Sequence, residues 1–145
     1  METQRETLER DSSFALAHYW LGLGLEALGR REEAIRAFRR SAALAGFGAL
    51  ALTGIAHANA GAGHRDSATA VLRMLEQRGR REYVPPYEVA AVHVALGDRT
   101  RALDLLARAV AERSHSIALV AVDPRFRTLA EDPRFRALTS VIRRR

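Results

Sequence analysis

The amino-acid sequence repeats one pattern at a fixed interval of 34 residues. In each copy a glycine is followed by an alanine and then by a large apolar residue: Gly29, Ala34 and Phe38, then Gly63, Ala68 and Leu72, then Gly97, Ala102 and Leu106. A period of this length with glycine at a turn indicates a repeated helix–turn–helix unit. One unit cannot bury its apolar face alone, so neighbouring units stack into a solenoid. We therefore predict an all-α fold, an α-solenoid of about three units.

The composition is compatible with packed helices. Aromatic residues make up only 6%, which suits closely approaching helices better than a sheet. The net charge of +6 comes from arginine without any lysine, which excludes Schiff-base chemistry and a phosphate-loop lysine. The absence of cysteine excludes disulfides and thiolate metal ligands.

The N-terminal segment does not resemble a targeting signal. Residues 1–10 are charged and lack the apolar core of a signal peptide. No run approaches the ~18 apolar residues of a membrane span. We expect a cytoplasmic protein with no membrane partner.

The pattern predicts one domain over residues 1–145. Its repeats span 14–46, 47–80 and 83–113, preceded by the remnant of a helix at 1–13 and followed by a cap at 114–145. Asp11, Ser12 and Ser13 are expected to cap the first full helix, which begins at Phe14. The helices are expected at 14–28, 31–45, 50–60, 66–77, 87–96 and 100–113, with Gly29 ending the first and Gly46 marking the break between the first two repeats.

A shorter repetition occupies the C-terminal end. The sequence Asp-Pro-Arg-Phe begins at Asp123 and returns at Asp132. Aspartate is a natural N-cap and proline a natural first helical residue, so two short helices are expected here after the apolar segment 117–122. A solenoid needs its terminal apolar face covered, and we interpret these helices as a cap that buries Phe126 and Phe135.

The first unit resembles a tetratricopeptide repeat. The resemblance lies in Leu21-Gly22, Gly29, Ala34 and Phe38. The second and third units match more loosely, with a large residue followed by a small one at Ile55-Ala56 and Val89-Ala90. The resemblance implies a tetratricopeptide-like array that binds proteins.

The C-terminal part has a second resemblance. Val84-Pro85-Pro86-Tyr87 and the two Asp-Pro-Arg-Phe motifs are similar to the tail of bacterial repeat proteins that carry a kinase or winged-helix regulator domain. No such effector domain stands in this sequence. The resemblance implies a binding, sensing or scaffolding module in signalling, and no chemistry.

In such arrays the first helices of successive units line a concave face. Stepping by the period gives the residues expected to line a ligand-binding groove: Leu16, Tyr19, Leu23, Glu26, Thr53, His57, Tyr87, Ala91 and Val94. Tyrosine offers contact area plus a hydroxyl at low entropy cost, which suits a peptide ligand. The alternative is that these side chains pack against the neighbouring helix or the cap. Thr53 and His57 stand where some relatives clamp a C-terminal carboxylate, so chaperone tails are not expected as ligands.

No residue set predicts catalysis, a metal or a cofactor. The five histidines share no metal-ligand spacing, and no glycine-flanked serine forms a nucleophile elbow. We therefore expect a non-catalytic protein whose partner is a protein or peptide.

Two alternatives remain open. Arginine clusters at Arg36–Arg40, Arg78–Arg81 and Arg143–Arg145 could neutralise phosphates of a nucleic acid or another anionic surface. Interspersed acidic residues and the lack of exposed stacking aromatics argue against nucleic acid. The other alternative is self-association through an exposed first or last helix.

Overall fold

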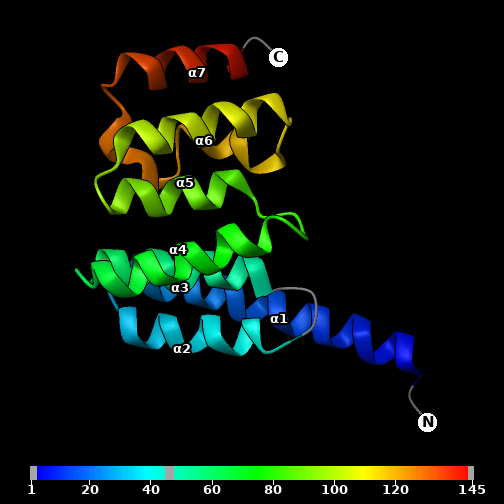
Figure 1. Ribbon diagram of the computed structural model, residues 1–145. Coiled ribbons are helices and arrows are strands. Elements are labelled where there is room, and N and C mark those ends of the chain that lie inside the picture. Colours follow the sequence, from blue (N-terminus) through cyan, green and yellow to red (C-terminus); the bar gives the residue numbers. More distant parts are fainter. Residues whose placement is uncertain (1–2, 45–47, 144–145) are drawn as a thin grey trace. The chain divides into compact units, whose positions relative to one another are not determined.

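The computed structural model describes residues 3–44 and 48–143, without the side chains of residues 7–9, 11 and 12. Within this part the fold is all-α, as predicted, with helices packed in adjacent pairs (Figure 1). The α-helices are α1 (Gln4–Ala27), α2 (Arg31–Ala42), α3 (Gly48–Gly61), α4 (Arg65–Arg78), α5 (Pro86–Ala95), α6 (Arg99–Ala111) and α7 (Pro133–Arg143). Two 3-10 helices, η1 (His115–Leu119) and η2 (Pro124–Leu129), lie between α6 and α7.

The chain divides into two compact units, Met1–Val84 and Pro85–Arg145. The first contains α1 to α4, and the second contains α5, α6, η1, η2 and α7. The sequence predicts one domain over residues 1–145, and that organisation stays a prediction. Each unit is described by itself below.

Phe38 is the centre of the first unit. Its fully buried ring on α2 lies against the bare backbone of Gly22 on α1 and of Gly54 on α3. A Cβ atom at either glycine would come within 2.5 Å of Phe38 Cε1, so these two helices approach the ring as closely as they do because neither carries a side chain there. The hydroxyl of Ser41 on the same helix donates to the Ala15 carbonyl at 2.7 Å and fixes α2 to α1.

The second unit has its own core, in which the C-terminal segments cover the α5–α6 pair. η2 packs on α5, while η1 and α7 pack on α6. Phe126 and Phe135 are buried in this core, as the sequence predicts for both phenylalanines. Asp123 and Asp132 accept backbone N–H groups of Arg125 and Arg134 at 3.0 and 2.8 Å, so both aspartates cap the helices that follow, as predicted.

The three periodic glycines end the first helix of each pair. Gly29, Gly63 and Gly97 have φ of 78°, 84° and 82°, in the left-handed region that glycine adopts without a steric penalty. After each of them the next N–H bonds back to a carbonyl of the last turn, as Arg30 N does to Leu25 O at 2.9 Å. This is the Schellman pattern, and it confirms the turn role predicted for Gly29.

α6 ends with the same backbone pattern but without a glycine. Arg113 has φ of 55°, and Ser114 N donates to Ala109 O at 3.1 Å. We expect Arg113→Gly to stabilise the second unit by about 0.5–1 kcal/mol, because the left-handed strain of a non-glycine residue is relieved. Thermal unfolding followed by circular dichroism measures this. Arg113→Ala keeps the Cβ atom and should give no gain, and an equal gain from both variants would contradict the strain.

The first helix begins earlier than predicted. α1 runs without a break from Gln4 to Ala27, so the expected boundary at Asp11–Ser13 is wrong. The N-cap is Thr3, whose Oγ1 accepts the Glu6 N–H at 3.1 Å while the Glu6 carboxylate accepts the Thr3 N–H at 2.8 Å. This capping box starts the helix at Gln4 and leaves no cap requirement at residues 11–13. The break expected at Gly46 and the arginines at 144–145 lie outside the described residues.

Candidate interaction surface

Tyr19, the first tyrosine of the predicted groove, lies in the core of the first unit. Its ring packs against Phe38 with the ring centroids 5.7 Å apart, and it meets the edge of Trp20 at 6.0 Å. Leu23, one turn further along α1, packs against the same core. Tyr19 therefore packs against the neighbouring helix, which is the alternative to a role in lining a groove.

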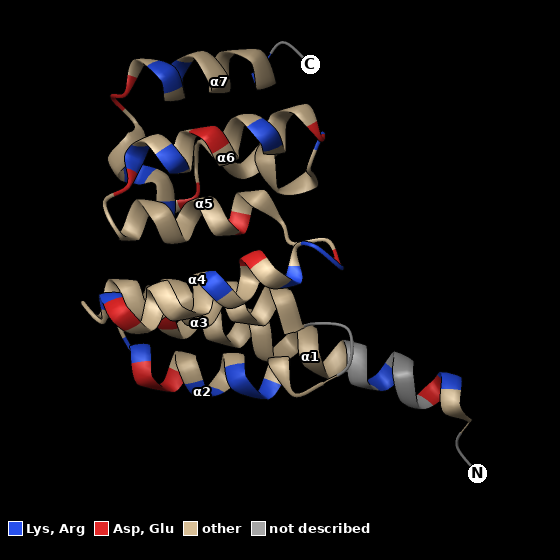
Figure 2. Ribbon diagram, in the orientation of Figure 1, with Lys and Arg blue, Asp and Glu red and all other residues tan. Residues whose placement is uncertain are grey.

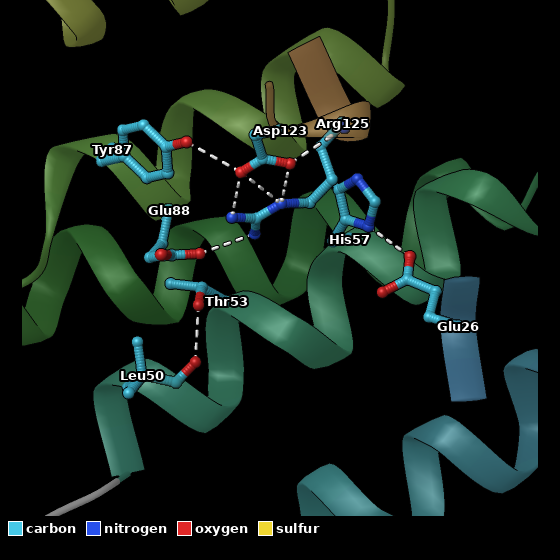
Figure 3. A network of polar contacts seen from close by, with 8 residues as sticks. All are labelled: Glu26, Leu50, Thr53, His57, Tyr87, Glu88, Asp123 and Arg125. Carbon is cyan, nitrogen blue, oxygen red and sulfur yellow. Dashed lines mark hydrogen bonds and ion pairs between the residues drawn. The ribbon is translucent and has the colours of Figure 1, made fainter. Parts of the chain in front are cut away.

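Tyr87 is likewise buried, in the core of the second unit, where it joins a polar network (Figure 3). Its hydroxyl donates to Asp123 Oδ2 at 2.7 Å, and its ring packs on Phe126 with centroids 5.0 Å apart. The guanidinium of Arg125 holds Asp123 through Nη2 and Oδ2 at 2.8 Å and holds Glu88 through Nη1 and Oε2 at 2.6 Å. One arginine thus joins the start of α5 to the segment that leads into η2.

The pKa values in this network favour its ionised and hydrogen-bonded form. Burial opposes ionisation of Asp123, but the hydrogen bonds and charge of Arg125 outweigh it and lower the pKa of that carboxyl. Burial also lowers the pKa of Arg125, yet the hydrogen bond to Asp123 and the charge of Glu88 raise it overall. Burial, followed by the hydrogen bond to Asp123, raises the pKa of Tyr87, so the phenol stays protonated and donates. These contacts therefore stabilise the packing of η2 on α5 in the second unit.

Two predicted groove residues meet directly in the first unit. His57 Nδ1 on α3 pairs with Glu26 Oε1 on α1, and both side chains are mostly buried (Figure 3). Thr53, one turn earlier on α3, donates its hydroxyl to the Leu50 carbonyl of its own helix at 2.5 Å. The sequence places Glu26 and His57 on one face, and the structure brings them into contact as an internal pair.

The remaining predicted residues are divided between the two units. Ala91 is buried in the second core and Val94 packs against it, whereas Leu16 on α1 is exposed. A groove that uses all nine residues stays a prediction, and within its own unit each tyrosine is part of the core.

The outer side of α1 is apolar and exposed. Between Ser13 and Leu28 the only charged residue is Glu26, and it faces inward to His57. The opposite side of this stretch presents large side chains to solvent, with Trp20 61% exposed and Leu21 50% exposed. The exposed large apolar residues of α1 and its C-cap are Phe14, Leu16, Trp20, Leu21 and Leu28, and we call them the α1 outer face. The sequence could have indicated this face, because the stretch between Ser13 and Leu28 is apolar on all sides. A helix of that kind is expected to be covered on every side.

The next repeat shows what such a position normally contacts. One period after Leu21 and Gly24 stand Ile55 and Ala58 on α3, and both are buried in the core that contains Phe38 of α2. The positions that pack against a helix in α3 are therefore open to solvent in α1. A Cβ atom at Gly24 would meet nothing within 4 Å.

A second surface is charged. Arg36, Arg39 and Arg40 are exposed on α2 and form no ion pair within the described part of the chain. Figure 2 shows acidic residues at the start of α2 and arginines along the rest. Arg30 pairs with Glu33 at 2.6 Å, so the acidic end is partly neutralised and the C-terminal half of α2 stays positive.

Residues 3–44 and 48–143 hold no group of three or more histidine or acidic side chains that could bind a metal ion. Among the described helices, none combines the length and apolar character that a membrane crossing requires.

Comparison with known proteins identifies one segment. The tetratricopeptide repeat family model matches residues 15–46, which cover most of α1, the turn at Gly29 and all of α2. Residues 15–46 are therefore similar to a tetratricopeptide repeat, and such repeats commonly mediate protein–protein interaction. No curated protein and no solved structure matches the chain.

Proposed function

We propose that this chain, whose residues 15–46 are similar to a tetratricopeptide repeat, is a non-catalytic protein-interaction module that binds its partner on the α1 outer face. The observation that carries the proposal is the exposure of Trp20, Leu21 and their neighbours on a helix side without charge. From the exposed fractions and the areas of such side chains, the apolar surface amounts to roughly 500 Å². A contiguous patch of this size is at the upper end of what a monomer exposes and is typical of a binding site.

The chemistry of the surface indicates the kind of partner. It offers one tryptophan, one phenylalanine and leucines, and no Asp, Glu or Arg side chain between Ser13 and Leu28 that faces outward. Tryptophan is enriched among the residues that dominate interface energies. The matching ligand is an apolar helix or helical hairpin of a second protein chain, which lies along α1.

Removal of the apolar surface should abolish binding without unfolding the chain. We expect Trp20→Glu to weaken retention of the partner from nuclease-treated lysate by roughly 30-fold or more, because a central tryptophan anchor is replaced by a charge. Met74→Glu on α4 is the matched control, since Met74 is another exposed large apolar residue, at 50%, and lies in the same unit. Circular dichroism verifies that both variants stay folded.

The two variants give a clear result. A protein retained by the native chain and by Met74→Glu, but lost by folded Trp20→Glu, supports the proposal. Equal retention by all three chains contradicts it and excludes the α1 outer face as the binding surface.

We also propose a biological setting. The resemblance of the C-terminal part to the tails of bacterial regulators supports a scaffold or sensor role in signalling. A cytoplasmic location belongs to the same proposal. The concave face with Leu23 and His57 is a further surface on which a peptide would bind under this proposal.

The unpaired arginines of α2 favour a second candidate, an anionic partner. Three guanidinium groups on one helix, which form no ion pair with a described residue, attract a polyanion. The same capture experiment separates the candidates. Binding that survives Trp20→Glu but falls steeply with salt would assign the partner to the arginines, because release of counterions makes such binding salt-dependent.

A further inference from the structure

The α1 outer face contains a regular seam. Phe14, Ala17, Leu21, Gly24 and Leu28 follow one another at alternating spacings of three and four residues. This is the spacing of the seam between two helices in a coiled coil. All five positions are exposed, so no described residue of the first unit occupies the seam.

The seam alternates large and small side chains. Phe14, Leu21 and Leu28 are large, whereas Ala17 and Gly24 between them are small. When two identical helices pack antiparallel, the first seam position of one helix lies opposite the second seam position of the other. Phe14 and Leu21 can then each fill the space above a small residue of the partner. In a parallel pair, large residues would meet large ones and the glycines would face each other across a gap.

We propose that the occupant of the α1 outer face is a second copy of this chain, with the two α1 helices antiparallel about a two-fold axis. This inference rests on the proposed function and specifies its partner. Phe14 lies opposite Gly24 of the other copy, and Leu21 lies opposite Ala17. This register overlaps most of the 24 residues of α1, and an isologous contact of this kind closes on itself as a dimer.

The size of the surface sets the strength of the dimer. Two copies with roughly 500 Å² each bury about 1,000 Å² together, which is at the low end for a specific protein interface. A dissociation constant on the order of 10 µM is therefore expected.

The experiment is analytical ultracentrifugation of the purified full chain from about 1 to about 300 µM, a range that spans this constant. A monomer that converts to a dimer is expected. Gly24→Gln should weaken the dimer at least tenfold, because a long side chain replaces the gap that receives Phe14. The same change places a better helix former in α1, so the folded monomer is preserved. Met74→Glu should leave the dimer unchanged.

Orientation is tested with cysteine pairs, which this cysteine-free chain allows without background. Phe14→Cys and Gly24→Cys chains of different size should form a mixed disulfide under mild oxidation, and neither should cross-link to itself. Self-cross-linking of Phe14→Cys alone would overturn the antiparallel pairing. A chain that stays monomeric throughout the range would overturn the dimer, and loss of lysate binding in Trp20→Glu would then still support the proposed function with a different partner.

Discussion

Phe38→Ala is expected to destabilise the first unit by about 3–5 kcal/mol, the usual cost of removing a buried phenylalanine. The ring is fully buried and joins three helices, because it lies between Gly22 of α1 and Gly54 of α3. A cavity at this point has no neighbouring side chain on either glycine to fill it. Chemical denaturation followed by Trp20 fluorescence measures the effect, since the only tryptophan lies in this unit.

Phe14→Ala is the matched control, because it deletes the same side chain from a position that is 53% exposed. Its cost should stay near or below about 1.5 kcal/mol, as half of the ring already contacts water. Phe38→Leu, a milder change, keeps the comparison possible if Phe38→Ala leaves the unit unfolded. Equal effects at positions 14 and 38 would contradict the central packing of Phe38.

A double-mutant cycle with Gly54 gives a sharper version of this prediction. In the native chain Gly54→Ala should destabilise by about 1–3 kcal/mol, because the new Cβ clashes with the Phe38 ring. In the Phe38→Ala background the same change should stabilise by up to about 1 kcal/mol, since alanine is the better helix former. The same sign in both backgrounds would show that Gly54 and Phe38 are not coupled.

The second large effect is expected at Arg125. Arg125→Ala should destabilise the second unit by about 3–5 kcal/mol, because it leaves Asp123 and Glu88 as carboxylates without their cation in a largely buried place. Arg127→Ala is the control, since Arg127 is exposed in the same 3-10 helix, and its effect should lie within about 0.5 kcal/mol. Thermal unfolding by circular dichroism compares them.

The charges can be tested apart from the packing. Asp123→Asn and Glu88→Gln, added to Arg125→Ala, should recover part of the lost stability because neutral amides no longer require a cation. If the triple variant is as unstable as Arg125→Ala alone, the lost stability comes from the packing of the aliphatic part of Arg125. The charges of the network would then contribute nothing measurable.

The lowered pKa of Asp123 predicts how this unit responds to acid. Its ionised carboxylate contributes stability that is complete above the usual carboxyl pKa of 3.8 and is lost as the pH falls below that value and through the lowered folded pKa. Asp123→Asn should flatten this part of the stability profile. A native profile that is already flat there would contradict the pairing with Arg125.

The sequence predicts the helices well because their ends are specified locally. Gly29 has the left-handed conformation that the period indicates, and Asp123 and Asp132 cap the segments that follow them. The start of α1 was predicted incorrectly, although its signal was present: Thr3 and Glu6 form a capping box at the expected spacing. The sequence does not predict the left-handed conformation of Arg113, because neither an arginine nor the residues beside it indicate a positive φ.

The candidate site was harder to predict because the 34-residue period shows which residues occupy equivalent helix positions but not whether those residues are buried. Stepping by one period predicts one row of Tyr19, Thr53 and Tyr87, yet both tyrosines lie in cores. Tyr87 is covered by Phe126 and Asp123, which arrive from a distant part of the chain. The uncharged stretch of α1 can be recognised in the sequence, but only the structure shows that Trp20 and Leu21 on one of its sides are exposed to solvent.

The measurement that tests the central claim most directly is photo-cross-linking in the source cell, with a photoreactive amino acid at position 20 of the α1 outer face and, as control, at position 74. A protein adduct is expected from position 20 and not from position 74. An adduct of twice the chain's mass would identify a second copy, and any other protein adduct a different partner on the same surface. No protein adduct at position 20, or the same adducts from both positions, would contradict the claim that this face of α1 is where the protein binds.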